Sequence, residues 1–484
     1  MRMKRIYIAV LLLAVLVTAC ELPDNLNPKA ATAVPTGTIV TNAQVALANN
    51  IDAISVNVNI NRMICQYTTE VTYVEGARYI YSDRQINDTY WDRYYRDVLM
   101  DLNEAKLLYA EETGNVVAMT ARDNKLAILE ILEVYTYQIL VDTWGDVPYT
   151  EALGGMENPT PVYDDAATIY NDLIARLSSA ISQLSANADG GSFGGEDVFF
   201  HGDVAMWIKA AGSMQLRMGM RLADVNSSLS ESLVTAAIAT GVLEDGDSWE
   251  LVYTGVTPHV NAIYNAFIVG QRKDYVPCNT FIDFLLAKND PRLPLFASTV
   301  PDTTIYLGMP YGLEGGDAYQ DYSHFSDQMF GASWPSVVVD YAEVQLMLAH
   351  AAAVGYTTPM TAQEHYDAGV TASVVSWGGA AADATAYLAA DGAYDAVNWK
   401  QSIGEQMWLA CYNRGNEGWN HWREFDVPAM TPAENMTVLD IPLRWPYPFN
   451  EIDLNGDNYA SASTAIGGDD VRTQVFWDAA PNTN

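Results

Sequence analysis

Few residues in this sequence have the types and spacing needed for covalent chemistry. Gly190, Ser192 and Gly194 fit the G-x-S-x-G spacing of serine hydrolases, but that nucleophile needs a strand before it and a helix after it. The preceding residues 185–189 are polar, so we interpret the segment as a flexible turn. The six histidines form no H-E-x-x-H zinc motif, and no lysine completes a phosphate-binding P-loop. The sequence therefore predicts no catalytic residue and no metal ligand.

One acidic turn is compatible with calcium. Asp453, Asn455 and Asp457 alternate as the ligands of a calcium loop do, but the glycine stands at the fourth position instead of the sixth, and no glutamate follows at the twelfth. We expect no cofactor and keep a structural calcium at this turn as an alternative. A catalytic carboxylate pair among the 60 acidic residues also stays open, because such pairs are recognised by their separation in space.

Aromatic residues form the other candidate site. The segment 306–334 is rich in Tyr, Phe, Gly, Asp and Ser and has no helical period. A loop of this length inside a folded chain is usually functional or disordered, and its aromatic content argues against disorder. We therefore expect this loop to carry function.

Helices must position these loops. Apolar residues recur at helical spacing through most of the chain, and few stretches alternate as strands would. Paired helices at intervals of about 30 to 45 residues predict a mainly α fold, a tetratricopeptide-like helical-repeat scaffold with loop-rich, largely irregular insertions. The expected helices span about 91–112, 124–144, 164–184, 203–225, 232–240, 279–286, 336–354, 362–377 and 398–411.

The N-terminal residues predict the compartment. Three basic residues precede an apolar run over 6–17 that is too short to cross a bilayer, as in a signal peptide. The run ends in L-V-T-A-C, which resembles a bacterial lipobox, so we expect removal of residues 1–19 and lipidation of Cys20. Residues 20–41 would form the lipidated N-terminus and a flexible tether. Residues 42–484 would form a single body.

Composition limits the partners of that body. Hydrophobic residues make up 49% of the chain, which is typical of a folded protein. The net charge of −35 argues against nucleic acid, because binding to phosphate backbones depends on Lys and Arg. A neutral ligand is more compatible with this negative charge than an anionic one. Cys65, Cys278 and Cys411 are widely spaced and lack a C-x-x-C motif, so we expect free, buried thiols.

Four segments carry a family resemblance. They are V-D-T-W-G-D-V-P-Y-T-E-A-L at 141–153, F-H-G-D with W-I-K and an arginine pair within 200–221, V-D-Y-A-E-V at 339–344, and W-L-A, W-N-H-W-R and I-P-L-R-W-P-Y-P within 408–448. In this order they resemble the SusD/RagB family, the lipid-anchored nutrient-binding proteins of the Bacteroidetes outer membrane. The chain departs from the family pattern at His350, where Glu is usual, and at Glu424, where Arg is common.

The resemblance implies a SusD-like ligand-binding body that is not an enzyme. Its members bind oligosaccharides or other nutrients at the cell surface and sit as a lid on a SusC-like TonB-dependent outer-membrane transporter. The acidic residues directly after Cys20 resemble a surface-export signal, which implies a lipid-anchored protein exposed outside the outer membrane. Two alternatives remain: a surface glycoside hydrolase, and a structural lid that contacts the transporter and no ligand.

Sugar chemistry then selects the candidate ligand residues. The ring faces of sugars carry C–H groups that stack on Trp and Tyr, while polar side chains bond the hydroxyls. Tryptophans within helical patterns, such as Trp144, Trp207 and Trp408, are expected in the core. Gly145 and Pro148 should end the helix after Trp144, with Asp146 bonding backbone N–H groups of the turn. The candidate ligand-binding residues lie outside the helical cores: Tyr90, Trp91, Tyr311, Tyr319, Tyr322 and Trp334.

Overall fold

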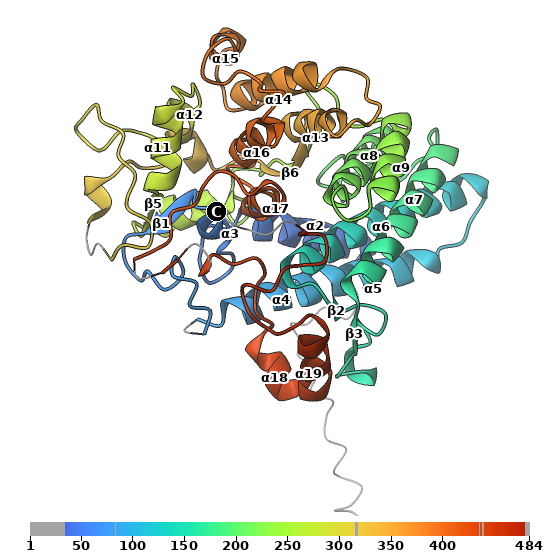
Figure 1. Ribbon diagram of the computed structural model, residues 1–484. Coiled ribbons are helices and arrows are strands. Elements are labelled where there is room, and N and C mark those ends of the chain that lie inside the picture. The colour runs from blue at the N-terminus through green and yellow to red at the C-terminus, as the bar shows by residue number, and fades with distance from the viewer. Residues whose placement is uncertain (1–33, 83, 315–317, 435, 438–439, 480–484) are drawn as a thin grey trace, which may run out of the picture.

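Helices dominate the computed structural model, which describes residues 34–82, 84–314, 318–434, 436–437 and 440–479. The strands in these residues form three two-stranded antiparallel sheets. Figure 1 shows the helices stacked on one side of the molecule and long loops around α11 and α12 on the other. The predicted mainly α, tetratricopeptide-like fold is confirmed. Within the described residues, no helix is both long and apolar enough to cross a membrane.

The long helices lie close to their predicted ranges. They are α6 (Val116–Trp144), α7 (Ala166–Ala186), α8 (Val204–Arg221), α9 (Ser227–Thr240), α11 (Asn279–Ala287), α13 (Tyr341–Ala353), α14 (Ala362–Ser376) and α16 (Trp399–Ala410). The range predicted at 91–112 is a longer helical run made of α4 (Ile86–Tyr94), a π-helical turn η1 (Tyr95–Leu99) and α5 (Met100–Ala110).

Further elements connect these helices. The helices are α2 (Thr36–Asp52), α3 (Asn61–Ile64), α10 (Ala262–Tyr264), α12 (Leu293–Phe296), α15 (Ala381–Leu388), α17 (Gly415–Phe425), α18 (Phe449–Leu454) and α19 (Gly456–Ala465). The strands are β1 (Thr68–Glu70), β2 (Val147–Pro148), β3 (Tyr163–Asp164), β4 (Ser248–Leu251), β5 (Tyr275–Pro277) and β6 (Ser336–Asp340).

Several predicted boundaries were wrong. Helix α6 begins at Val116, eight residues before its predicted start, where the side chain of Asn115 caps it. Residues 336–340 form strand β6 and not the start of a helix, because this β-branched run pairs with β4. Helix α2 begins at Thr36, inside the segment 20–41 assigned to the tether, because Val40 and Leu47 are buried in the core. The leader, Cys20 and the rest of the tether lie outside the described residues.

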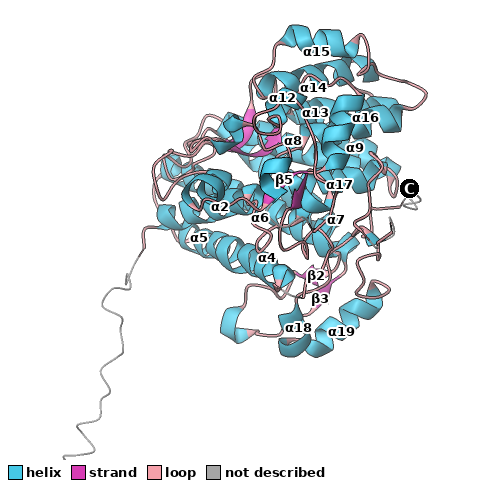
Figure 2. Ribbon diagram, turned by 90° about the vertical axis from the view of Figure 1, so that its left-hand side faces the viewer, coloured by secondary structure: helices cyan, strands magenta, loops and turns pink. Residues whose placement is uncertain are grey.

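Neighbouring helices pack as pairs, which produces the repeat scaffold. α6 packs on α7, α8 on α9, α13 on α14, and α16 on α17. Polar caps mark several starts: Asp165 caps α7, Asp203 caps α8 and Asp340 caps α13. Figure 2 shows α18 and α19 below the main stack, close to β2 and β3.

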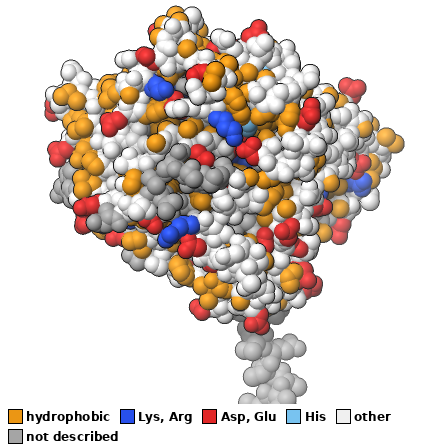
Figure 3. All heavy atoms as spheres, viewed as in Figure 1, with side chains coloured by type: hydrophobic (Ala, Val, Ile, Leu, Met, Phe, Trp, Pro, Cys, Tyr) orange, Lys and Arg blue, Asp and Glu red, His pale blue; other side chains and the backbone are white. Residues whose placement is uncertain are grey.

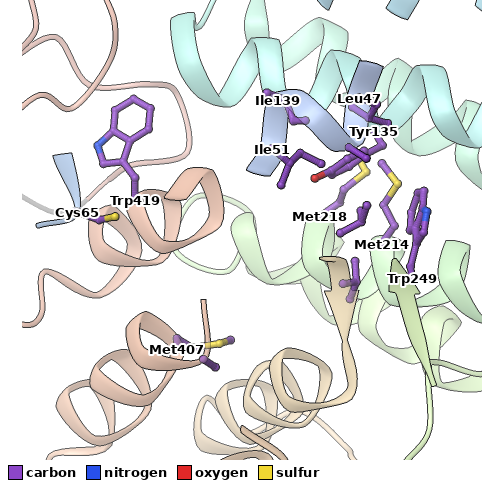
Figure 4. Packing of buried hydrophobic residues seen from close by; sticks show 14 of the residues in the cluster. Leu47, Ile51, Cys65, Tyr135, Ile139, Met214, Met218, Trp249, Met407 and Trp419 are labelled. Carbon is purple, nitrogen blue, oxygen red and sulfur yellow. The ribbon is translucent and has the colours of Figure 1, made fainter. Parts of the chain in front are cut away.

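The main core lies where α2, α6, α8 and β4 meet. Figure 4 shows side chains from these elements pointing toward one another. Helix α6 is buried around its whole circumference over its second half, as its apolar sequence predicted. The residues labelled in this part of the core are Leu47, Ile51, Tyr135, Ile139, Met214, Met218 and Trp249.

The W-G-D motif joins both ends of the chain. Trp144 is fully buried, its ring centroid lies 5.1 Å from that of Trp91 and 5.8 Å from that of Trp445, and its Nε1 donates to Pro446 O at 2.9 Å. The helix ends after Trp144 at Gly145, whose φ of +80° suits glycine. Asp146 differs from the prediction: its carboxylate accepts from the N–H of Ala166, at the start of α7.

A buried ion network crosses the scaffold. Glu343 on α13 accepts two bonds from Arg217 on α8, at 2.7 and 2.8 Å, and one from Arg414 at 2.5 Å. Glu417 on α17 lies 3.0 Å from Arg221, the second arginine of the α8 pair. Burial alone raises the pKa of Glu343, but Arg217 and Arg414 hold it well below its usual range. Glu343 is therefore ionised at neutral pH.

The two departures from the family pattern meet in this network. His350 Nδ1 lies 3.2 Å from Glu424 Oε1, and the other carboxylate oxygen of Glu424 lies 3.1 Å from Arg221 and 3.0 Å from His421. Burial lowers the pKa of His421, but bonds with Cys411, Glu343 and Glu424 outweigh it and hold the pKa well above its usual value. Glu424 therefore has three charged or titratable neighbours in this network.

We expect Glu343→Gln to destabilise the protein by about 3–5 kcal/mol, because it leaves Arg217 and Arg414 buried without their shared counter-charge. Denaturant unfolding measures this change. The control is Asp97→Asn at a partly exposed pair with Arg96, which should change the free energy of unfolding by about 0.5 kcal/mol or less. Equal, small changes in the free energy of unfolding for both variants would show that the buried ion network does not stabilise the fold.

Candidate functional site

The aromatic loop lies on a small sheet. β1 pairs with β5, and Met309 continues this sheet, since its N–H donates to Pro277 O at 3.1 Å and it forms a bridge with Cys278. Val71, Val276 and Met309 form an apolar cluster of their own, separate from the main core. The sheet thus anchors the start of the long loop to the N-terminal part of the chain.

Two predicted ligand residues meet on this sheet. Tyr319 and Tyr322 are half-buried and pack against the cluster of Val71, Val276 and Met309. The ring of His324 stacks on Tyr319 with a centroid distance of 4.0 Å, and its Nε2 lies 2.8 Å from Tyr319 O. Burial and the charge of Asp274 raise the pKa of Tyr319, so its hydroxyl remains a hydrogen-bond donor at neutral pH.

A strained segment borders these tyrosines. Tyr73 and Tyr79 have φ of +62° and +60°, a region that bulky residues rarely occupy and that costs about 1–3 kcal/mol at each position. Tyr73 follows two residues after Val71 and is 66% exposed, with the guanidinium of Arg84 5.3 Å from its ring centroid. Such strain is found at active sites and ligand clamps, although eight other non-glycine residues in the described part of the chain also have a positive φ.

These groups define one surface, which we call the loop face: Tyr73, Arg84, Asp274, Tyr319, Tyr322 and His324. The N–H of Val71 donates to Asp274 O at 2.9 Å, so the Tyr73 segment and Tyr319 both lie next to Asp274. Figure 3 shows apolar side chains exposed along the left edge, where Figure 1 places the loops near α11 and α12. Leu307, which is 46% exposed, is bonded through its N–H and C=O to Ser323 beside Tyr322.

Three other predicted ligand residues are buried and present no ring to a ligand. Tyr90 is completely buried against Trp445 and Trp144, and Trp91 packs on Trp144. Tyr311 is buried in the loop's base, with its ring 6.2 Å from that of Tyr79. The sequence analysis placed these residues outside the helical cores, but Tyr90 and Trp91 lie in α4 and all three rings pack against residues distant in sequence. We therefore correct their assignment from ligand binding to packing.

Trp334 lies in a different environment from Tyr319 and Tyr322. Its half-buried ring packs on Trp377 at 5.3 Å, and its carbonyl accepts from Asn261 at 3.1 Å. The long loop therefore divides between two clusters, and a role for Trp334 in binding remains a prediction. Tyr73 and Arg84 were missed because a positive φ and an aromatic–guanidinium contact have no sequence signal.

The described residues also test the catalytic and metal candidates. Ser192 donates to Gly202 O within a loop, with neither strand nor helix beside it. Asn455 connects α18 to α19, and its side chain donates to Pro161 O at 2.9 Å. Glu343, Glu417 and His421 have ligand atoms close enough for a metal ion, but arginines already occupy the positions around both carboxylates. This cluster fits an ion network better than a metal.

Comparison with known proteins identifies the family. Residues 28–448 match the SusD-like family, described as starch-binding and associating with the outer membrane. The chain therefore belongs to the SusD-like family. Comparison with curated proteins gives no match.

Solved structures agree with this assignment. A chitin-binding protein is 26% identical, with a TM-score of 0.79, over 92% of this chain and 100% of that one. A chitin-binding SusD homologue from Flavobacterium johnsoniae is 23% identical, with a TM-score of 0.80 over 92% and 99% of the two chains. A SusD homologue from Bacteroides thetaiotaomicron is 20% identical, with a TM-score of 0.77 over 93% and 100%.

Glu70 lies beneath the strained segment and should make stability depend on pH. Burial raises the pKa of its carboxyl from 4.5 to about 8, although Arg84 opposes this. A raised pKa means that the folded state favours the neutral form, so its contribution to stability is complete below about pH 4.5 and is lost as the pH rises through about 8. We expect Glu70→Gln to remove this loss and to raise Tm at pH 9 relative to wild type, but not at pH 4. Parallel Tm profiles from thermal scans would contradict this role of Glu70.

Proposed function

We propose that this protein captures a neutral oligosaccharide or polysaccharide on the loop face and delivers it to a SusC-like TonB-dependent outer-membrane transporter. The observation that carries the proposal is the exposed ring of Tyr73, which has a positive φ, lies two residues after the Val71 on which Tyr319 packs, and has the guanidinium of Arg84 5.3 Å from its centroid. The 66% exposed ring of Tyr73 contributes little to packing. An exposed tyrosine ring of this kind is suited to stacking on the C–H face of a sugar.

The chemistry of the loop face suits neutral sugars. Tyr73 and Tyr319 offer aromatic surface, while Arg84, Asp274 and His324 offer donors and acceptors for hydroxyl groups. The chain as a whole carries a net charge of −35, which disfavours an anionic glycan. Because the 26% identical structure is described as a chitin-binding protein, a chain of N-acetylglucosamine is the first ligand to test.

Delivery to a transporter requires the protein to stay at the membrane. The family is described as associating with the outer membrane, and Cys20 would supply the lipid anchor through the lipobox. In this proposal the anchored body lies over a SusC-like barrel and passes its ligand inward. A structural lid without a ligand would instead use the exposed Tyr73 as a contact with the transporter.

The hydrolase alternative is less well supported. A glycosidase needs an accessible acid with a raised pKa and a second carboxylate about 5–10 Å away. Glu70 has a raised pKa, but it is only 1% exposed beneath the strained segment; the half-buried Asp426 also has a raised pKa, about 6, but it lies outside the loop face. Glu70 cannot reach a glycosidic oxygen in this conformation.

Isothermal titration calorimetry with chitohexaose, maltohexaose and a sulfated hexasaccharide tests the proposal, together with chromatography of the sugar after incubation. Binding of a neutral hexasaccharide without shorter products would support capture. Shorter products would support a hydrolase. Absence of binding to all three sugars would contradict the proposed capture of a neutral glycan.

We expect Tyr73→Ala and Tyr319→Ala each to raise the Kd for the bound sugar at least about tenfold, equivalent to about 1.4 kcal/mol, because each removes one stacking surface. The matched control is Tyr356→Ala, a half-buried tyrosine near α9 whose hydroxyl donates to Ser227 O. It should leave Kd unchanged. Wild-type affinity in both loop-face variants, with folding verified by circular dichroism, would exclude the loop face as the sugar-binding site.

A further inference from the structure

Two hollows meet at the start of α16, which lies between the α13–α14 pair and α17 (Figure 1). One is about 480 Å³ and the other about 180 Å³, and Asn398 and Gln401 line both. The larger hollow also includes Trp399, Lys400 and Asp426, while the smaller reaches Tyr366. We call the combined feature the α16 groove. It is made of other segments than the loop face.

An aromatic ring is fixed in the wall of this groove. Trp399 is half-buried, and its ring packs 5.2 Å from the imidazole of His350 at an interplanar angle of 31°. His350 is itself buried and lies 3.2 Å from Glu424 in the ion network. The ammonium of Lys400 lies 5.7 Å from the centroid of Trp399. The ring is therefore held in place by the scaffold and does not depend on a mobile loop.

Asn398, Gln401 and Asp426 line the larger hollow together with Trp399, and Asn398 and Gln401 also line the smaller one. Gln401 is exposed and donates to Glu405 at 2.9 Å, and Asn398 donates to Asp395 at 2.8 Å. Asp426 ends α17 with a φ of +57° and lines the hollow beside Lys400, with its pKa raised by burial to about 6. Amides and carboxylates next to a fixed indole are the groups that bind sugar hydroxyls while a ring stacks.

The charges of the groove select the class of ligand. Four carboxylates line it, those of Asp391, Asp395, Glu405 and Asp426, against two lysines. Both lysines already have partners: Lys288 lies 2.9 Å from Glu405, and Lys400 lies 3.3 Å from Asp224. An anionic glycan would meet excess negative charge and no free cation among the lining residues. A neutral sugar would meet acceptors for its hydroxyl protons.

We propose that the α16 groove is a second carbohydrate-binding site, in which Trp399 stacks on a neutral pyranose and Asn398, Gln401 and Asp426 bond its hydroxyls. For the class of ligand, this inference rests on the proposed function, but it concerns different residues. Two sites on one anchored body would hold a long polysaccharide at two points and increase its avidity.

Hydroxyl-radical footprinting of the full chain in detergent, with chitohexaose at millimolar concentration, tests the groove directly. We expect the oxidation of Trp399 to fall severalfold, together with that of Tyr73 and Tyr319. Protection of Tyr73 and Tyr319 without protection of Trp399 would contradict sugar binding in the α16 groove and would still support the proposed function. Protection of Trp399 alone would support the groove and contradict the loop face, and protection of neither would overturn both.

Two variants keep the test independent of folding defects. Gln401→Trp adds a bulky side chain at the exposed junction of the two hollows and removes no buried contact, so the protein should fold normally. We expect it to reduce the number of chitohexaose molecules bound, measured by calorimetry, from two to one, and Trp399→Ala to do the same. An unchanged stoichiometry of two in Gln401→Trp would overturn the proposal. A sulfated hexasaccharide should not protect Trp399, and equal protection by it would contradict the assignment to neutral sugars.

Discussion

The structure depends on charges buried between its helices. Arg217 and Arg221 on α8 meet Glu343 on α13 and Glu417 on α17, so that one network joins three helices far apart in sequence. Removing such ions from water costs several kcal/mol each, and only complete pairing offsets this cost. The requirement fixes the relative positions of the helices more tightly than apolar contacts alone could. Within this network, His350 Nδ1 lies 3.2 Å from Glu424.

This rigid scaffold supports surfaces of lower intrinsic stability. The segment with Tyr73 and Tyr79 keeps strained φ values because the β1–β5 sheet and the buried Glu70 hold it from below. On another part of the molecule, His350 connects the network to the Trp399 ring. There the buried His350 packs against the half-buried ring of Trp399. A preorganised ring loses little entropy when a sugar stacks on it.

The scaffold could be predicted from sequence much better than the site. The apolar circumference of α6 predicted its buried second half. Asp165 and Asp203 are strong capping residues, so the starts of α7 and α8 were predicted within a few residues. Segment 336–340 was misassigned because a short apolar run fits helix or strand equally well. Tyr90 and Tyr311 were misassigned because their burial comes from segments distant in sequence. Tyr73 was missed because its exposure and its φ depend on the folded loop.

The most direct test of the central claim, that the loop face binds a neutral glycan, is a crystal structure of the protein with chitohexaose. The account predicts sugar rings stacked on Tyr73 and Tyr319, with hydroxyl groups bonded to Arg84 or Asp274, and an intact chain. An unoccupied loop face in crystals where these residues are open to solvent would contradict it, as would a cleaved sugar bound beside a carboxylate pair.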